Sequence, residues 1–206
     1  MTILGVFAHP DDEVLGAGGT LARLAKEGHV VSIMVMGIRD LYQELSASCA
    51  VLGIKDFWHE DYPDQRFDQE ALLFIIQKIE ANLAELSPRK VFTHHTGDLN
   101  LDHAIVARAT LTATRPKPEC SVKEVFMCEV PSATEWAFSG CFKPNTFIDI
   151  SGTLEVKLQA MACYPTEMRP FPHPRSPEAL RALAMYRGSM MGMEAAEAFE
   201  LVRSLQ

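Results

Sequence analysis

Two short stretches of the chain concentrate side chains that bind metals and move protons. The first covers residues 9–13, where His9, Asp11 and Asp12 follow an apolar run. Because His9 and Asp12 are three residues apart, one turn can point both at a single cation. Asp11, between them, would point elsewhere and act as a base. The alternative is that Asp11 or Asp12 only caps the helix that follows.

The second stretch covers residues 94–103 and again follows a predicted strand. Its polar members are His94, His95, Asp98, Asn100, Asp102 and His103. One such loop is compatible with helix capping alone. Two such loops, each at the carboxyl end of a predicted strand, favour a shared site instead. A His/Asp/His set with an open position is the ligand pattern of catalytic zinc.

The elements that must position these loops alternate along the chain. Apolar, β-branched runs predict strands at 2–8, 30–36, 90–94, 122–130 and 146–150. Apolar residues at helical spacing predict helices at 15–28, 43–52, 69–86, 102–113, 152–164, 176–190 and 194–204. This order predicts one α/β domain over residues 1–206. We expect a Rossmann-like, mostly parallel sheet with helices on both faces and a helical C-terminal part.

Composition excludes several classes of protein. The 206 residues carry a net charge of −8, with 19 Lys and Arg against 27 Asp and Glu, so we expect no nucleic-acid partner. No apolar run approaches the roughly 20 residues of a membrane span, and we expect no signal peptide because the start lacks a basic region. The five cysteines are odd in number and lack Cys-x-x-Cys spacing, which predicts a reduced, cytoplasmic protein.

Residues 9–13, with Asp102 and His103 after a later strand, resemble the PIG-L/LmbE-like family of zinc-dependent N-deacetylases. The resemblance extends over most of the chain. It includes residues 52–54, 64–66, 129, 187–188 and 196–199. Residues 97–103, 131–136 and 172–176 are similar to the bacterial branch of this family, which is linked to sugar metabolism and surface polysaccharide biosynthesis.

The resemblance implies that His9, Asp12 and His103 bind Zn²⁺, with another divalent metal as the alternative. It implies that Asp11 is the general base. The implied reaction removes the N-acetyl group from an amino sugar such as N-acetylglucosamine, carried on a nucleotide, a lipid or another glycoconjugate. It also implies a homo-oligomer. Two other functions remain open: an amidase that cleaves a larger acyl or thiol conjugate, and a non-catalytic module that binds a sugar or nucleotide.

Residues 100–103 depart from the family, in which many members carry His-Pro-Asp-His. Asn100 replaces the first histidine, so it can donate a hydrogen bond to an oxyanion but cannot carry a proton. We therefore predict that another group protonates the leaving amine. His95 (or His94 from the same loop) is the first candidate, and Asp11 is the second. Asp102 is expected to orient a neighbouring side chain.

Four residues outside the two loops are candidates for substrate binding. Arg66 and Arg39 would meet a phosphate or a sugar hydroxyl. His173 and Arg175 lie in the Pro-rich segment 165–177 and would line the site as a lid. The glycine-rich residues 16–19 lack Gly-x-Gly-x-x-Gly spacing, so we expect them to pack a helix closely on the sheet.

Overall fold

The computed structural model describes residues 1–37, 40–138 and 140–205. Its strands are β1 (Thr2–Phe7), β2 (Val30–Val35), β3 (Asp56–His59), β4 (Lys90–His94), β5 (Glu124–Cys128), β6 (Thr146–Asp149) and β7 (Ala196–Ser204). Its α-helices are α1 (Asp12–Lys26), α2 (Tyr42–Leu52), α3 (Leu72–Leu86), α4 (Leu101–Ala113), α5 (Leu154–Met161) and α6 (Pro177–Ser189). Two 3₁₀ turns, Phe67–Gln69 and Thr134–Trp136, interrupt the loops after β3 and β5.

The strands form one sheet in the order β3-β2-β1-β4-β5-β7-β6. β1 pairs in parallel with β2 and β4, and the parallel pairing continues outward to β3 and β5. β7 runs antiparallel to both β5 and β6. The predicted mostly parallel α/β sheet is therefore confirmed. The chain winds outward in opposite directions from β1 and β4, which makes this pair the switch point where such folds bind ligands.

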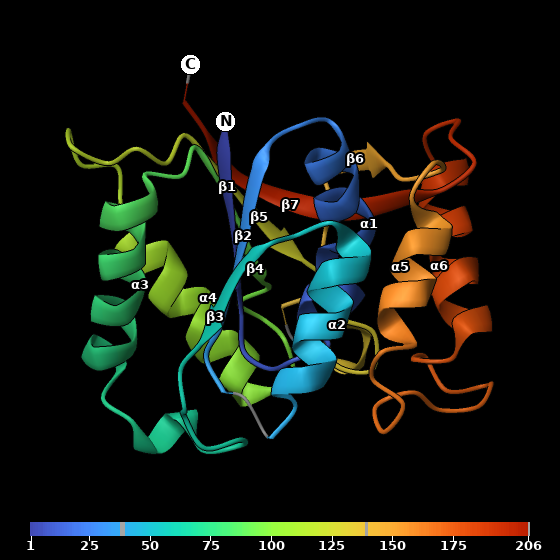
Figure 1. The fold of residues 1–206 in the computed structure, drawn as a ribbon, viewed down its shortest axis with the longest axis horizontal. Coiled ribbons are helices and arrows are strands. Elements are labelled where there is room, and N and C mark those ends of the chain that lie inside the picture. The colour runs from blue at the N-terminus through green and yellow to red at the C-terminus, as the bar shows by residue number, and fades with distance from the viewer. Residues whose placement is uncertain (38–39, 139, 206) are drawn as a thin grey trace.

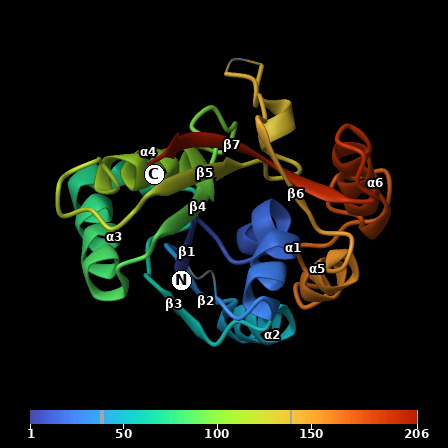
Figure 2. The ribbon, with the colours of Figure 1, turned by 90° about the horizontal axis from the view of Figure 1, so that it is seen from above.

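Helices cover both faces of the sheet, as Figures 1 and 2 show. α1, α2 and α5 lie on one face with α6 beside α5, and α3 and α4 lie on the other. Along β1, Ile3 and Phe7 join the core under α1, whereas Leu4 and Val6 join the core under α3 and α4. This two-sided burial explains the continuous apolar run of β1. Across the described ranges, no helix is both long and apolar enough to cross a membrane.

The helix predicted at 194–204 is wrong, because this segment is the strand β7. Its alanines and glutamates favour helix locally, but the segment is placed between β5 and β6, where pairing outweighs that weak preference. Glu197 is buried there and accepts hydrogen bonds from the backbone N–H groups of Gly19 and Thr20, at 3.0 and 2.7 Å. The four-residue edge strand β3 was not predicted from the sequence.

The glycine-rich start of α1 packs closely on the sheet, as its spacing suggested. A Cβ atom on Gly16 would lie 2.4 Å from Sγ of Cys128 in β5. At that distance the side chain of Cys128 would have to shift to admit a Cβ atom at position 16. The close approach holds α1, and therefore the loop that precedes it, in a fixed position over the sheet.

Candidate metal centre and active site

The two polar loops meet because β1 and β4 are adjacent and parallel. Their carboxyl ends point toward the lower edge of the molecule in Figure 1. Residues 8–11 connect β1 to α1, and residues 95–100 connect β4 to α4. Both helices therefore begin at this edge, and their N-termini favour negative charge there.

His9, Asp12 and His103 form a compact group of ligand atoms at this edge. One atom from each residue lies within 4.8 Å of the other two. Oδ2 of Asp12 lies 3.4 Å from Nδ1 of His9 and 3.3 Å from Nε2 of His103. All three side chains are at least 97% buried. Two imidazoles and one carboxylate that converge in this way fit a divalent ion such as zinc, with a coordination position left for water or substrate.

The far nitrogen of each histidine faces a carboxylate. Nε2 of His9 lies 3.1 Å from Oδ2 of Asp102, and Nδ1 of His103 lies 3.4 Å from Oδ2 of Asp98. Asp102 also accepts hydrogen bonds from the backbone N–H groups of Gln65 and Phe67. Histidines that bind metals commonly have such a carboxylate behind them, which fixes the ring and its tautomer. The carboxylates behind the two histidines therefore fit a metal site as well as the three ligands do.

Without a metal, this group of side chains binds protons. Burial lowers the pKa of His9, but hydrogen bonds to nearby carboxylates, that of Asp102 foremost, outweigh burial and raise the pKa to about 11. Burial also lowers the pKa of His103, and the charge of Asp12 outweighs it and raises the pKa to about 9. The pKa of Asp12, which burial raises, is held well below its usual range by His103. A divalent ion must therefore displace protons from both histidines at neutral pH.

Asp11 occupies the N-cap position of α1 but makes no side-chain capping hydrogen bond. Its backbone has φ 94° and ψ −30°, an unusual conformation for a residue with a Cβ atom. Its carboxylate is 1% exposed and accepts a hydrogen bond from Nη1 of Arg175 at 3.0 Å. Capping therefore does not explain Asp11. Its role as base stays a prediction.

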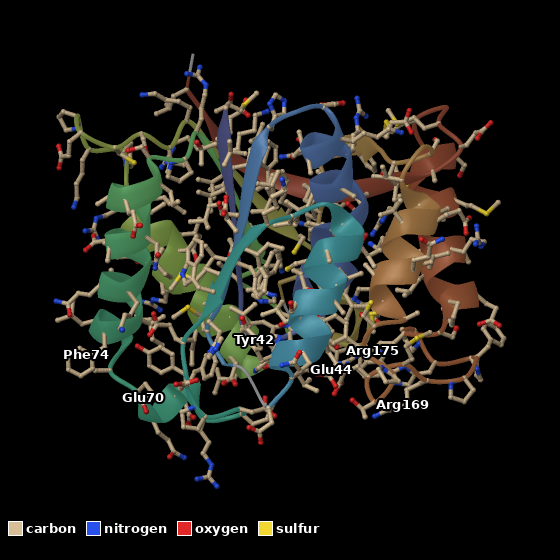
Figure 3. The ribbon with its side chains drawn as sticks, viewed as in Figure 1. Tyr42, Glu44, Glu70, Phe74, Arg169 and Arg175 are labelled. Carbon is tan, nitrogen blue, oxygen red and sulfur yellow. The ribbon has the colours of Figure 1, made fainter. Side chains whose placement is uncertain are left out.

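Arg175 brings the Pro-rich loop between α5 and α6 to the site. Its guanidinium binds Glu167 at 2.8 Å and Oγ of Ser132 at 2.7 Å in addition to Asp11. Figure 3 shows Arg175 at the same lower edge, in the loop beneath α5. The loop thus lies over Asp11, where the sequence analysis expected a lid.

Comparison with known proteins identifies the family. The family model described as PIG-L, GlcNAc-PI de-N-acetylase, matches residues 4–114, more than half of the chain. The chain belongs to the PIG-L family. Both polar loops lie within the matched range.

Individual relatives extend the match beyond residue 114. An uncharacterized deacetylase of Escherichia coli, YaiS, is 31% identical over 77% of this PIG-L chain and 88% of its own length. A probable N-acetyl-α-D-glucosaminyl L-malate deacetylase of Bacillus cereus is 26% identical over 79% of this chain and 81% of its own length.

A solved structure shows that the fold alone does not decide the reaction. GalB of Pseudomonas putida, described as a 4-carboxy-2-hydroxymuconate hydratase, superposes with a TM-score of 0.80. It covers 100% of this PIG-L chain and 97% of its own length at 20% sequence identity. The same architecture therefore occurs with a different chemistry, and the side chains at the site must decide what this chain does.

Asn100 and His94 have structural contacts in the second loop. Oδ1 of Asn100 caps α4 by accepting the N–H of Asp102 at 3.0 Å. The role of its amide NH₂ toward an oxyanion stays a prediction. His94 is fully buried, accepts the N–H of Ala8 at 2.8 Å and stacks on His103 with ring centroids 4.1 Å apart. Burial and the charge of His103 lower the pKa of His94 to about 3. His94 is therefore neutral and supports the ring of His103.

His95 has its described contacts on another side of the loop. Nδ1 accepts the N–H of Gly97 at 3.2 Å, and Nε2 lies 3.4 Å from Oε1 of Glu200 in β7. The ring packs edge-on against Phe142, with centroids 5.5 Å apart. None of these partners belongs to the metal group. The acid role of His95 stays a prediction, and these contacts do not support it.

The remaining candidates for substrate binding differ in their surroundings. Arg66 is exposed and lies between Gln65 and Phe67, whose N–H groups bind Asp102. His173 accepts the N–H of Arg175 at 3.1 Å and packs edge-on against Trp136. His173 therefore shapes the loop that carries Arg175. Arg39 lies outside the described residues.

Two supporting carboxylates were missed from the sequence. Asp98 faces His103, and its Oδ2 also accepts the hydroxyl of Thr134 at 2.6 Å. Asp64 lies 3.0 Å from Nε2 of His9. Asp98 could have been predicted as the partner of His103, because a histidine that binds metal normally has a carboxylate behind it and Asp98 lies in the same polar stretch. Asp64 lies within residues 64–66, which look like the family, but no role was predicted for it because its loop is remote in sequence from both polar stretches.

Proposed function

We propose that this chain is a metal-dependent N-deacetylase that hydrolyses the acetamide of an N-acetylated amino sugar. The observation that carries the proposal is the buried His9–Asp12–His103 group, with Asp11 between His9 and Asp12 in the chain and its carboxylate not used to cap α1. Membership of the PIG-L family supports it further. We propose zinc as the ion because two imidazoles and one carboxylate suit it.

The residues of the chain divide the work of hydrolysis. A bound divalent ion would supply Lewis-acid activation of water and of the acetamide carbonyl. Asp11 accepts the proton that the attacking water loses, and it can return that proton to the amine when the C–N bond breaks. Asn100 has an amide NH₂ left to donate to the oxygen that gains charge. The products are acetate and the free amino sugar.

The proposed substrate class rests on the relatives and on the arginines near the site. The Bacillus cereus relative is named for an N-acetylglucosaminyl substrate, and we extend that class to this chain, with the sugar carried on a nucleotide, a lipid or a glycoconjugate. Arg175 and Arg66 are the candidates for its hydroxyl or phosphate groups. We further propose a cytoplasmic homo-oligomer that acts in sugar or polysaccharide metabolism.

The test is a screen for acetate release. The zinc-loaded protein is incubated with N-acetylated sugars, sugar nucleotides and glycolipids, and acetate is measured enzymatically. The Asp11→Asn variant serves as the control, because it keeps the fold and the three metal ligands. We expect acetate from at least one substrate with wild type and far less with the variant.

Other outcomes would replace the proposal. Amine release without acetate, from substrates with larger acyl or thiol-bearing groups, would make the protein an amidase of another class. Sugar or nucleotide binding without any turnover would make it a binding module. Binding of one zinc per chain, measured separately by elemental analysis, distinguishes a wrong substrate from a wrong centre.

A further inference from the structure

Asp11, the base of the proposed reaction, has an unusual backbone conformation. Asp11 has φ 94°, outside the regions that residues with a Cβ atom normally occupy. Its carbonyl accepts the N–H groups of Val14 and Leu15 and so begins α1. Nothing in that pattern requires the positive φ. Another contact must hold the backbone there against its own preference.

That contact comes from Glu13. Oε2 of Glu13 accepts the backbone N–H of Asp11 at 2.9 Å. The other oxygen, Oε1, accepts the hydroxyls of Ser48 in α2 at 2.9 Å and of Tyr164 after α5 at 2.6 Å. Glu13, Ser48 and Tyr164 are all completely buried. One oxygen of the carboxylate is thus held by Ser48 of α2 and by Tyr164 in the segment after α5, and the other binds the N–H of Asp11.

We propose that Glu13 is a positioning residue that holds the backbone of Asp11 so that its carboxylate serves the reaction. This inference rests on the proposed function for its catalytic meaning. The role requires a hydrogen-bond acceptor and not a charge. A glutamine at position 13 can turn its carbonyl oxygen to the Asp11 N–H and its NH₂ to the two hydroxyls, since both hydroxyls can also accept. An apolar residue there leaves the N–H of Asp11 without its acceptor.

Two substitutions separate these cases. Glu13→Gln should keep kcat within about threefold of wild type, since every hydrogen bond can be remade. Glu13→Leu should lower kcat by up to about 100-fold, because a displacement of about 1 Å in a reacting group costs that much. KM and the zinc content should change little, because the metal ligands and the substrate contacts remain. A variant that is only unstable would show a lower melting temperature with kcat per folded protein retained.

A matched pair of variants guards against misfolding. In the triple variant Glu13→Leu/Ser48→Ala/Tyr164→Phe the buried pocket is wholly apolar, so no hydroxyl is left unsatisfied. It is compared with Ser48→Ala/Tyr164→Phe, which keeps the acceptor for Asp11. The kcat of the triple variant should be the lower of the two, and the difference should vanish when both also carry Asp11→Asn. Equal kcat values in the presence of Asp11 would overturn the proposal, as would a Glu13→Gln variant as slow as Glu13→Leu.

The position of Asp11 can also be measured without turnover. A crystal structure of the triple variant should show φ of residue 11 outside the positive range and the contact with Arg175 lost. An unchanged φ and an unchanged contact would overturn the role of Glu13 even if no substrate had been found. A changed φ together with no acetate release by the wild type would instead overturn the proposed function alone.

Discussion

The loops after β1 and β4 are equally polar but differ in how their side chains are used. In the first loop, His9 and Asp12 belong to the metal group, and Asp11 lies beside them with Glu13 behind it. In the second polar stretch, residues 94–103, only His103 provides a ligand atom to that group, from the first turn of α4. The other polar residues cap α4, support a histidine or, as with His95, contact β7 instead.

The difference follows from the length and constraint of each loop. The first loop turns sharply from a central strand into α1, which Gly16 holds against the sheet, so its side chains have little freedom. The second loop needs six residues to reach α4. Both stretches use polar side chains to satisfy their own backbone, because Asp12 and Glu13 accept the N–H groups of His9 and Asp11. N–H groups of Gly97, Asn100 and Asp102 are each accepted by a side chain of the same loop. The two stretches therefore differ in how many of their side chains reach the metal group, and both cap their own backbone.

The largest effect is expected from the one ligand that the second loop supplies. His103→Ala removes an imidazole from a three-ligand site, so bound zinc and turnover should both be lost. Elemental analysis after desalting measures the metal, and His29→Ala at the far end of the sheet serves as a matched histidine control. Full zinc retention in His103→Ala would show that the second loop contributes no ligand.

Asp11→Asn should have the next largest effect. The amide keeps the size of the side chain and its contact with Arg175 through the carbonyl oxygen, but it cannot accept a proton. The rate should fall by about 10²–10⁴-fold while zinc remains bound, as expected for a general base. Steady-state kinetics with parallel metal analysis tests this. Near-normal turnover would assign the base to another carboxylate and leave Asp11 a structural role.

Asp98→Asn tests whether the second loop supports the metal as well as binding it. The substitution weakens the charge behind Nδ1 of His103, so zinc affinity should fall by about 10–100-fold. A competition titration with a chelating dye measures it, with Asp68→Asn on the exposed surface as the control. Equal zinc affinity in both variants would leave Asp98 with its contacts to Thr134 and the N–H of Asn100 and no role in metal binding.

Metal binding should release protons, because the pKa values of His9 and His103 are about 11 and about 9 in the metal-free protein. Both rings are protonated at pH 7, and zinc must displace those protons. Apparent zinc affinity should therefore rise between pH 7 and 9, by up to roughly tenfold per pH unit for each proton released. Calorimetry in buffers of different ionisation enthalpy counts the protons. Zinc uptake without proton release would contradict the protonated state of the two rings.

His95→Gln should have the smallest effect. Its contacts with Gly97, Glu200 and Phe142 place its chemistry outside the metal group, so the rate should change by less than about threefold. Asn100→Ala is the comparison from the same loop, and losing its amide donor should cost more, up to about 10²–10³-fold. A strong loss in His95→Gln, with the alkaline limb of the pH profile removed and zinc retained, would restore His95 as the acid.

Most of the architecture could be predicted from local patterns. β1 is a continuous apolar run and β4 is a short strand around Val91 and Phe92, and both appear within a residue of their predicted bounds. The helix predicted at 102–113 is α4. The failures are β3 and β7, whose strand character comes from their neighbours in the sheet. Ala196 to Ser204 has a helix-like composition, and only the open position between β5 and β6 makes it a strand.

The sequence by itself determined which residues could bind a metal. Short spacing after a strand pointed to His9 and Asp12, and the resemblance to the PIG-L family implied His103 as the third ligand. The structure brings all three within reach of one ion. Only the tertiary structure decided which side chains from distant segments contact the two polar stretches. Asp64, Arg175 and Tyr164 reach the site from distant segments, and His95 leaves it although it adjoins β4. Local spacing sets the direction of a side chain within a turn, but contacts between segments far apart in the chain exist only once the sheet and its helices have packed.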